Sequence, residues 1–287
     1  MSSSVVESYA YCVDVARRQA RNFYYSFLLL PRAQREAMCA IYAFMRHCDD
    51  LSDEPDAATH TGALEEWRRQ LHGVLSGADG DNPLWPAFRD AVMRFRIPHQ
   101  YFDEMIDGVS SDLTARRVES FEELYRYCYQ VASVVGLVIV HIFGFDDPGA
   151  LVLAEKCGIA FQLTNIIRDV REDAERGRVY LPAEDLRRFG VDAGEFLRSP
   201  NGGSGFQKLM EFEASRARLY YQESAPLTRM VGKESQASLW ALIAIYSKLL
   251  RRIEQSHFDV LRRRIRLHSG EKLWILAQAT VRARLGV

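Results

Sequence analysis

Apolar residues recur at three- and four-residue spacing along most of the chain, which is the pattern of amphipathic α-helices. The clearest examples are long segments without an interior proline, at 35–53, 121–142, 153–173 and 236–258. Strict alternation of apolar and polar residues between turn pairs, the pattern of β-strands, is essentially missing from the sequence. The spacing therefore predicts an all-α protein.

Stretches that contain proline and glycine separate the helical segments and mark the expected loops. They lie at 54–55, 76–86, 97–98, 147–149 and 198–205. The last stretch has the composition of a flexible loop, but it is short for a link between domains. Helical segments of the same character continue after it, and no repeat of fixed period is visible. We therefore expect one helical domain over residues 1–287.

The composition is that of an ordinary globular protein, with 48% hydrophobic residues, 26% charged residues and a net charge of −1. This balance gives no overall attraction to nucleic acid, so we expect no nucleic-acid partner and require a local site for any anionic ligand. None of the five cysteines forms a Cys-x-x-Cys pair, which favours reduced, structural thiols and a cytoplasmic protein. The cysteines are Cys12, Cys39, Cys48, Cys128 and Cys157.

No segment has the pattern of a signal peptide or a membrane-spanning helix. Residues 1–10 lack a basic start and an apolar core. The longest apolar run, 131–140, is followed by His141 and is too short to span a bilayer. Peripheral contact at the inner face of a membrane stays open. The arginines at 262–266 are by default a solvated face, and contact with anionic lipid is the alternative.

Two carboxylates stand at the end of the first long helical segment. Asp49 and Asp53 are four residues apart and therefore share one helix face. Pro55 disfavours helical geometry before it, so both carboxylates lie in the last turn. The helix dipole there disfavours negative charge by a few tenths to about 1 kcal/mol. A bound divalent cation would remove this penalty, and a solvated acidic helix end is the alternative.

A second polar stripe lies on the predicted helix 153–173. Asn165, Asp169 and Asp173 recur every four residues, with Gln162 one turn earlier. The residues before the stripe are apolar and are expected to be buried, so its carboxylates need partners. Hard oxygen ligands of this kind suit Mg²⁺, which bridges protein carboxylates and phosphate groups. The alternative is a surface stripe that pairs with the neighbouring arginines.

The two acidic stripes together predict metal ions on opposite walls of a helical bundle. Such a site suits a substrate with a diphosphate leaving group, because metal ions stabilise the departing pyrophosphate. The sequence lacks the glycine-rich loop of P-loop nucleotide enzymes. A di-metal four-helix bundle needs two Glu-x-x-His motifs, and the chain has only the one formed by Glu254 and His257.

Six short motifs follow one another in a specific order and spacing, although each is weak alone. They are 22–27 with Leu30-Pro31, 41–46 leading into Asp49–Asp53, 127–136, 165–182, Tyr246 and 263–266. Together they resemble the squalene/phytoene synthases along nearly the whole chain. The resemblance implies an all-α isoprenoid-synthase fold with a central cavity. It also implies the head-to-head joining of two prenyl diphosphates, with Mg²⁺ as the cofactor and Mn²⁺ as a substitute.

The resemblance also implies three sets of site residues. The metal ligands would be Asp49 and Asp53 for one diphosphate, and Asn165, Asp169 and Asp173 for the other. The catalytic residues would be Tyr42, Tyr129, Gln162 and Tyr246 near the reacting carbons, together with Arg46, Arg168 and Arg264, of which Arg46 and Arg264 would contact diphosphate oxygens. The substrate-binding residues would be Phe23, Tyr25, Val131, Ala132, Ser133, Gly136 and Tyr180. Plain core packing is the alternative for the apolar members of the last set.

The substrate is open between farnesyl and geranylgeranyl diphosphate. Family members of the eukaryotic type reduce the cyclopropyl intermediate with NADPH and carry a C-terminal membrane helix. We expect neither that helix nor a dinucleotide fingerprint here, and NADPH use is left open. We favour farnesyl diphosphate, converted to presqualene diphosphate or squalene, over phytoene made from geranylgeranyl diphosphate. The alternatives of other kinds are a non-catalytic helical assembly protein and a single-substrate terpene cyclase. The oligomeric state is left open.

Overall fold

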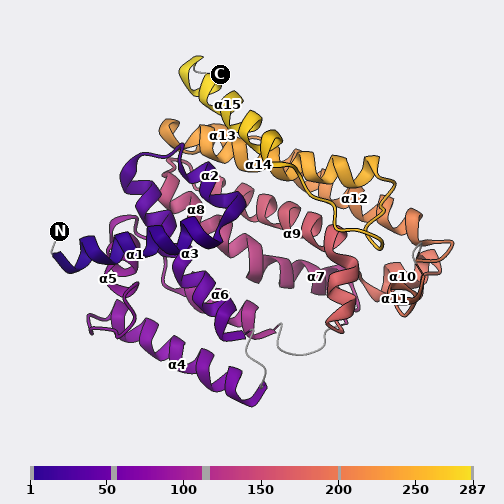
Figure 1. Cartoon of the computed structure of the whole chain (residues 1–287), viewed down its shortest axis with the longest axis horizontal. Coiled ribbons are helices and arrows are strands. Elements are labelled where there is room, and N and C mark those ends of the chain that lie inside the picture. Colours follow the sequence, from indigo (N-terminus) through magenta and orange to yellow (C-terminus); the bar gives the residue numbers. More distant parts are fainter. Residues whose placement is uncertain (1–2, 53–56, 112–116, 200–201, 286–287) are drawn as a thin grey trace.

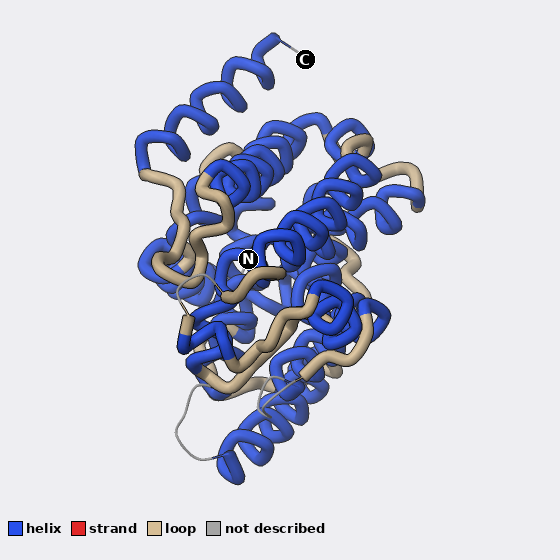
Figure 2. The backbone as a smooth tube through the Cα atoms, turned by 90° about the vertical axis from the view of Figure 1, so that its right-hand side faces the viewer, coloured by secondary structure: helices blue, strands red, loops and turns tan. Residues whose placement is uncertain are grey.

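Helices provide nearly all the regular structure of the protein. The structure is a computed structural model and describes residues 3–52, 57–111, 117–199 and 202–285. Figure 2 shows only helices and loops in this part of the chain, where strand-like pairing is limited to two isolated bridges. The all-α class predicted from the apolar spacing is confirmed.

The N-terminal helices and α8 share one hydrophobic core. These helices are α1 (Ser3–Gln19), α2 (Arg21–Phe27), α3 (Arg32–Ser52), α4 (Ala57–Leu75), α5 (Trp85–Arg94), α6 (Gln100–Ser111) and α8 (Val134–Phe143). Stacked aromatic rings fill its centre. The ring centroids of Phe44 and Phe88 are 4.7 Å apart, and those of Trp67 and Trp85 are 4.2 Å apart. Offset aromatic pairs of this kind add to the stabilisation from buried area.

The remaining helices surround a second core. They are α7 (Phe121–Cys128), the π-helix η1 (Tyr129–Ser133), α9 (Gly149–Glu175), α10 (Ala183–Phe189), α11 (Glu195–Arg198), α12 (Phe206–Ser224), α13 (Leu227–Met230), α14 (Lys233–Gln255) and α15 (Ser269–Leu285). Figure 1 shows α9 in the middle of the bundle. Tyr129 and Phe161 pack against both cores, so the two cores meet beside η1 and α9.

The long helices predicted from the sequence are present, with shifted ends. Three of the four segments form the single helices α3, α9 and α14, and α14 ends three residues before the predicted limit of 258. The fourth, 121–142, is divided by η1 into α7 and α8. The predicted loops at 76–86, 97–98 and 147–149 fall between helices, except that α5 already begins at Trp85 and α9 at Gly149. The loop at 54–55 lies outside the described residues.

Two helical segments are long and apolar enough to cross a membrane, namely Phe121–Phe143 and Gly149–Glu175. Phe121–Phe143 contains the apolar run 131–140, which is too short to cross a membrane by itself. Half of the most apolar stretch in Phe121–Phe143 is buried inside the protein, and 56% of that in Gly149–Glu175 is buried. The two segments also pack against each other along α7, η1 and α8. Packing inside the bundle therefore accounts for their apolar character.

Two glycines allow the neighbouring helices to approach η1 closely. A Cβ atom at Gly158 of α9 would lie 2.5 Å from Cα of Ser133, and one at Gly108 of α6 would lie 3.1 Å from Val131 Cγ1. The first distance leaves no room for a side chain. On the same side, the Ser133 hydroxyl donates to the backbone oxygen of Glu155 over 2.7 Å. The π-helical turn is therefore clamped between α6 and α9.

All five cysteines are buried, as expected for structural thiols. Burial raises the pKa of the Cys12 and Cys39 thiols to about 12. Both thiols therefore stay protonated and weakly nucleophilic at neutral pH. Cys157 differs in its position, because its side chain reaches the central cavity described below.

A buried polar cluster joins α10 to α12. Asp185 and Glu213 are 3% and 1% exposed, and both bind the guanidinium of Arg216. That guanidinium also lies over the rings of Phe121 and Phe212, 4.3 and 4.4 Å from their centroids. Burial raises the pKa of Glu213 to about 7; Arg216 opposes this shift and the nearby Asp185 adds to it. Glu213 therefore carries a proton in mildly acidic solution.

We expect Glu213→Gln to stabilise the protein at pH 8 but not at pH 5. The folded carboxyl keeps its proton up to about pH 7, whereas the unfolded one releases it near its ordinary pKa. The free energy of unfolding therefore falls as the pH rises through this window. The glutamine would recover about 2–3 kcal/mol at pH 8. Urea unfolding of both proteins at the two pH values measures the effect, and an equal difference at both would contradict the raised pKa of Glu213.

Candidate active site

Helix α9 carries the predicted polar stripe on one face. Gln162 and Asn165 are joined by a hydrogen bond in which Asn165 Nδ2 donates to Gln162 Oε1 over 3.3 Å. Asp169 and Asp173 follow at four-residue intervals, and both are partly buried. The Asn165 Oδ1 atom is buried without a hydrogen-bond partner. The stripe therefore begins at Asn165, whose amide oxygen is buried, and continues to the partly exposed carboxylates of Asp169 and Asp173.

The Asp169 carboxylate lies between two guanidinium groups. Arg168 Nε donates to Asp169 Oδ1 over 2.8 Å, and Arg264 Nε lies 3.0 Å from the same oxygen. The side chain of Arg168 is only 16% exposed. Its burial lowers the pKa of Arg168, but the bond to Asp169 outweighs this and keeps the group charged. Arg264 reaches α9 from the loop after α14 and also pairs with Glu172 over 2.9 Å.

The end of α3 presents the first acidic cluster to solvent. Asp49 and Asp50 are exposed, and Asp50 pairs with Arg46. The Nε atom of Arg46 is buried without a hydrogen-bond partner. Burial raises the pKa of Tyr42, one turn before Arg46. The predicted ligand Asp53 lies outside the described residues.

An apolar cavity of about 230 Å³ lies where the two cores meet. Six predicted site residues line it, from η1, α8, α9 and α14. They are Val131, Ala132, Gly136, Gln162, Asn165 and Tyr246. The small side chains at Ala132, Gly136, Ala154 and Gly158 leave its middle open. The prediction of a central cavity walled by this part of the sequence is confirmed.

The cavity relates the two acidic clusters to each other. Met45 of α3 and Asn165 of α9 both line it. Asp49 follows Met45 by four residues and Asp169 follows Asn165 by four, so each carboxylate continues the face of its helix that meets the cavity. By this spacing Asp49 and Asp169 flank the cavity from two different helices, and the metal ions expected between them stay a prediction.

Aromatic residues form part of the cavity wall and its surroundings. The rings of Phe161 and Tyr246 stack with centroids 4.2 Å apart and planes 7° apart. Burial raises the pKa of Tyr246. Tyr129 packs between the two cores without lining the cavity, and burial together with Glu104 of α6 raises its pKa to about 12. These phenols therefore stay neutral at physiological pH.

Three predicted substrate-binding residues lie away from the cavity. The Ser133 side chain points to α9, where its hydroxyl is bound to Glu155. Tyr180 is buried and stacks on Tyr127 with centroids 4.7 Å apart. Tyr25 is 41% exposed on α2. Packing or solvent contact occupies each of these three side chains, and their contact with substrate stays a prediction. The side chain of Phe23 lies outside the described part of the chain.

The sequence analysis missed several residues of the cavity wall. Met45, Phe161, Leu239 and Leu242 line it beside the predicted residues. Their apolar helical spacing marks them as buried, but the same spacing describes an ordinary core. For Gly158, the glycine inside a long apolar helix was an available signal, because such a residue often marks a close approach.

The residues present fit Mg²⁺ held together with a substrate diphosphate. Within the described residues, no three His, Cys, Asp or Glu side chains converge on one point. Mg²⁺ commonly binds one or two carboxylates, with waters and phosphate oxygens completing its shell. The buried Asn165 oxygen without a partner costs about 1–3 kcal/mol, and a cation or its bound water would satisfy it. Asp169, one turn away, supplies the adjacent carboxylate.

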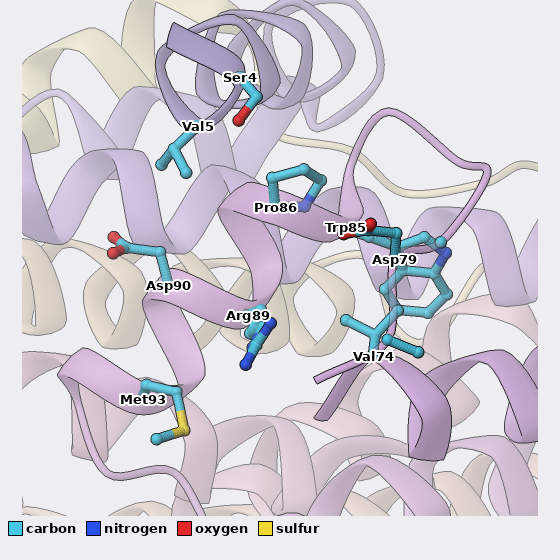
Figure 3. A pocket seen from close by; sticks show the side chains of 11 residues that line it. Ser4, Val5, Val74, Asp79, Trp85, Pro86, Arg89, Asp90 and Met93 are labelled. Atoms are coloured by element: carbon cyan, nitrogen blue, oxygen red, sulfur yellow. The ribbon is translucent and has the colours of Figure 1, made fainter. Parts of the chain in front are cut away.

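A second hollow lies on the surface between α1, α4 and α5. The residues that line it differ from those of the central cavity. Its volume is about 400 Å³, and Figure 3 shows Trp85, Arg89, Asp90 and Met93 around it. No predicted site residue lines it. Its side chains are mixed in character and do not form a set of convergent metal ligands.

Comparison with known proteins identifies the family. The family model described as squalene/phytoene synthase matches residues 16–271. The chain belongs to the squalene/phytoene synthase family. It is thus a prenyltransferase that joins prenyl diphosphates head to head, and membership implies Mg²⁺ dependence.

Curated relatives and solved structures agree with this family. The chain is 37% identical to a 15-cis-phytoene synthase of Synechocystis sp., over 99% of this chain and 87% of the relative. It is 34% identical to phytoene synthase 1 of Zea mays, over 95% of this chain and 68% of the relative. A solved dehydrosqualene synthase superposes with a TM-score of 0.87 at 29% identity, covering 98% of both chains. The squalene synthase of Alicyclobacillus acidocaldarius superposes with a TM-score of 0.83 at 25% identity, covering 90% of this chain and 97% of that structure. The predicted all-helical isoprenoid-synthase fold is confirmed.

Proposed function

We propose that this squalene/phytoene synthase condenses two molecules of geranylgeranyl diphosphate to phytoene. The support is the set of curated relatives at 34–37% identity over nearly the whole chain, which are named phytoene synthases. The proposal replaces farnesyl diphosphate, which we favoured from the sequence. That preference used no information on the depth of the cavity.

The shape of the cavity is compatible with a long prenyl chain. Its lining on α9 extends from Asn165 at the polar end to Ala154, which is eleven residues, or about 16 Å along the helix axis. Small residues of η1 and α8 face this stretch. An apolar tail can therefore lie along α9 with its diphosphate near Asn165 and Asp169.

The polar end would hold the two diphosphates. Arg46, Arg168 and Arg264 present guanidinium groups there, whose forked donors match phosphate oxygens. Mg²⁺, bound by Asp49 and by the Asn165–Asp173 stripe, would supply positive charge against the departing pyrophosphate. Because Arg264 is already paired with Asp169 and Glu172, it is oriented toward the α9 stripe before substrate binds.

The apolar part would protect and guide the carbocation. Loss of pyrophosphate from one substrate leaves an allylic cation, which the double bond of the second substrate attacks. Loss of a proton then gives a cyclopropylcarbinyl diphosphate. Release of its pyrophosphate gives a second cation, which rearranges and loses another proton to form the central double bond of the hydrocarbon. The stacked rings of Phe161 and Tyr246 lie in the wall, where π faces stabilise nearby positive charge. The apolar lining excludes the water that would quench the cation.

Product analysis tests this proposal. The enzyme is incubated with Mg²⁺ and either geranylgeranyl or farnesyl diphosphate, with and without NADPH, and the products are separated and identified by mass. We expect phytoene from geranylgeranyl diphosphate, independent of NADPH. Presqualene diphosphate or squalene from farnesyl diphosphate, with no product from the longer substrate, would overturn the assignment in favour of the alternative. A C15 cyclic product would indicate a cyclase.

We expect a chelator to abolish turnover without unfolding the protein. EDTA should stop pyrophosphate release, and excess Mg²⁺ or Mn²⁺ should restore it. The thermal midpoint should change little, because Arg168 and Arg264 already neutralise Asp169 in the protein alone. Pyrophosphate release and circular dichroism, followed on the same samples, measure both effects. Full turnover in EDTA would contradict a metal-dependent site.

A further inference from the structure

The C-terminal part of the chain is strongly basic. Residues 248–285 contain ten Lys and Arg against three Asp and Glu, a net charge of +7. The rest of the chain contains 27 Lys and Arg against 35 Asp and Glu, a net charge of −8. The near-neutral total therefore hides a separation of charge between one end of the chain and the remainder.

The loop between α14 and α15 directs its arginines outward. Leu261, Ile265 and Leu267 are buried, whereas the arginines among them are exposed. Two contacts fix the loop on the bundle: Arg171 Nη1 donates to the backbone oxygen of Leu261 over 2.8 Å, and Arg252 Nη1 donates to that of Arg266 over 3.2 Å. The buried apolar residues anchor the loop, and the cations are held at the surface. The exposed cations are Arg262, Arg263, Arg264 and Arg266.

Helix α15 has an apolar face that no other element of the described residues covers. Ile275 and Ala279 are buried where the helix packs on α14. On the other side, Leu273, Trp274 and Val281 are 55%, 63% and 53% exposed. Their spacing of one, seven and eight residues places them on a single face. Figure 2 shows α15 at the edge of the molecule with open space along its outer side.

The basic loop and α15 form one continuous surface. Arg266 of the loop and Lys272 of α15 line the same hollow of about 310 Å³. Leu273 and Trp274 come directly after Lys272. The nearby acidic groups are already engaged: Asp259 pairs with Arg263 over 3.1 Å, and Glu271 pairs with Arg252 over 2.6 Å. An excess of cations therefore borders the exposed apolar face.

We propose that the loop 262–268 and the outer face of α15 dock onto an anionic lipid bilayer. A tryptophan and aliphatic side chains on one helix face, bordered by arginines, match the boundary between headgroups and acyl chains. Each cation near an anionic leaflet contributes about 1 kcal/mol. A symmetric dimer through this face would instead bring two surfaces of the same positive sign together. The charge therefore favours a lipid surface over a second copy of the chain.

Docking would place the active site close to the bilayer. Arg264 belongs to the docked loop and also pairs with Asp169, so the polar end of the cavity lies under this surface. The prenyl chains of the substrates and the hydrocarbon product are poorly soluble in water. The inference rests on the charge and exposure of this surface and not on which prenyl chain length the enzyme uses.

Vesicle co-sedimentation tests the proposal. The probes are vesicles of phosphatidylcholine alone and vesicles that also contain phosphatidylglycerol. We expect the full-length enzyme to bind the anionic vesicles and not the neutral ones, with weaker binding at high salt. Arg262→Gln with Arg263→Gln should weaken partitioning about tenfold or more, at about fivefold for each lost cation. Leu273→Ser with Trp274→Ser should weaken it at least tenfold, because both side chains are exposed and would enter the interface.

The control is Met93→Ser. Met93 is an apolar residue of α5, 62% exposed, beside the hollow shown in Figure 3. It should bind vesicles as the unchanged enzyme does. All variants should keep their thermal midpoints and their turnover of detergent-dispersed substrate. Undiminished binding by the Leu273/Trp274 variant would overturn the proposal. So would a dimer in sedimentation velocity that this variant dissociates, since a second copy would then cover the face.

Discussion

Replacing Asp169 by asparagine is expected to lower turnover about a thousandfold while the protein stays folded. The carboxylate follows the cavity-lining Asn165 by one turn and is held between Arg168 and Arg264. An amide oxygen still accepts hydrogen bonds from the arginines, but it binds Mg²⁺ weakly. A metal ion contributes several kcal/mol of charge stabilisation in the transition state, and about 4 kcal/mol corresponds to a thousandfold change in rate.

The matched control for this change is Glu175→Gln on the same helix. Glu175 also pairs with an arginine, Arg171, over 2.9 Å, but it is exposed and does not belong to the stripe. Its replacement should leave turnover within about twofold. Initial rates of pyrophosphate release, with circular dichroism on both variants, separate the two outcomes. Equal activity of Asp169→Asn and Glu175→Gln would refute the role of the α9 stripe.

Gly158→Ala is expected to destabilise the protein and to reduce activity together. A Cβ atom there would lie 2.5 Å from Ser133 Cα and 2.7 Å from its nitrogen. Both contacts are with backbone, so α9 and η1 must separate. Overpacking of this kind costs about 1–3 kcal/mol or more, which lowers the thermal midpoint by roughly 3–10 °C. Because η1 and Gly158 both line the cavity, turnover should fall as well.

Gly62→Ala in α4 serves as the control for this prediction. Apart from the adjoining backbone of α4, no atom of the described residues lies within 4 Å of the position that its Cβ would take. Alanine is favoured over glycine inside a helix by about 0.5–1 kcal/mol. The midpoint should therefore stay constant or rise slightly. Differential scanning calorimetry of the two variants gives the comparison. A normal midpoint for Gly158→Ala would mean that the close approach of α9 and η1 is not needed.

Local rules were sufficient to predict the stripe on α9 from the sequence. A spacing of four residues fixes the relative direction of side chains on a helix, so Asn165, Asp169 and Asp173 had to share a face wherever the helix lay. The same rule gives the exposed end of α3 at Asp49. The partner of Asp169 could not be obtained in this way. Arg264 is 95 residues away, and only the folded arrangement of loop and helix brings them together.

The position of Ser133 outside the cavity wall also has a physical cause. The family resemblance implied that Ser133 and Gly136, both small, line the substrate cavity. Both residues approach α9, where the Ser133 hydroxyl donates to the backbone oxygen of Glu155 and a Cβ atom at Gly136 would lie 3.1 Å from the backbone oxygen of Ala154. Residue size alone does not show that the serine hydroxyl is bound to a neighbouring helix. The preference for farnesyl diphosphate, which the proposed function replaces, had a different basis. Chain length depends on the depth of the cavity, which apolar periodicity does not encode.

The π-helical turn at Tyr129–Ser133 makes the helical phase sensitive to a single residue. Such a turn holds one residue more than an α-helical turn with the same ends, and one residue rotates a helix by about 100°. Deleting one residue there would restore regular hydrogen bonding, yet it would turn Val135 and Gly136 away from the hollow or displace Tyr129 from its place between the cores. Functional variants of this chain should therefore tolerate substitutions in the turn far better than a shortening by one residue.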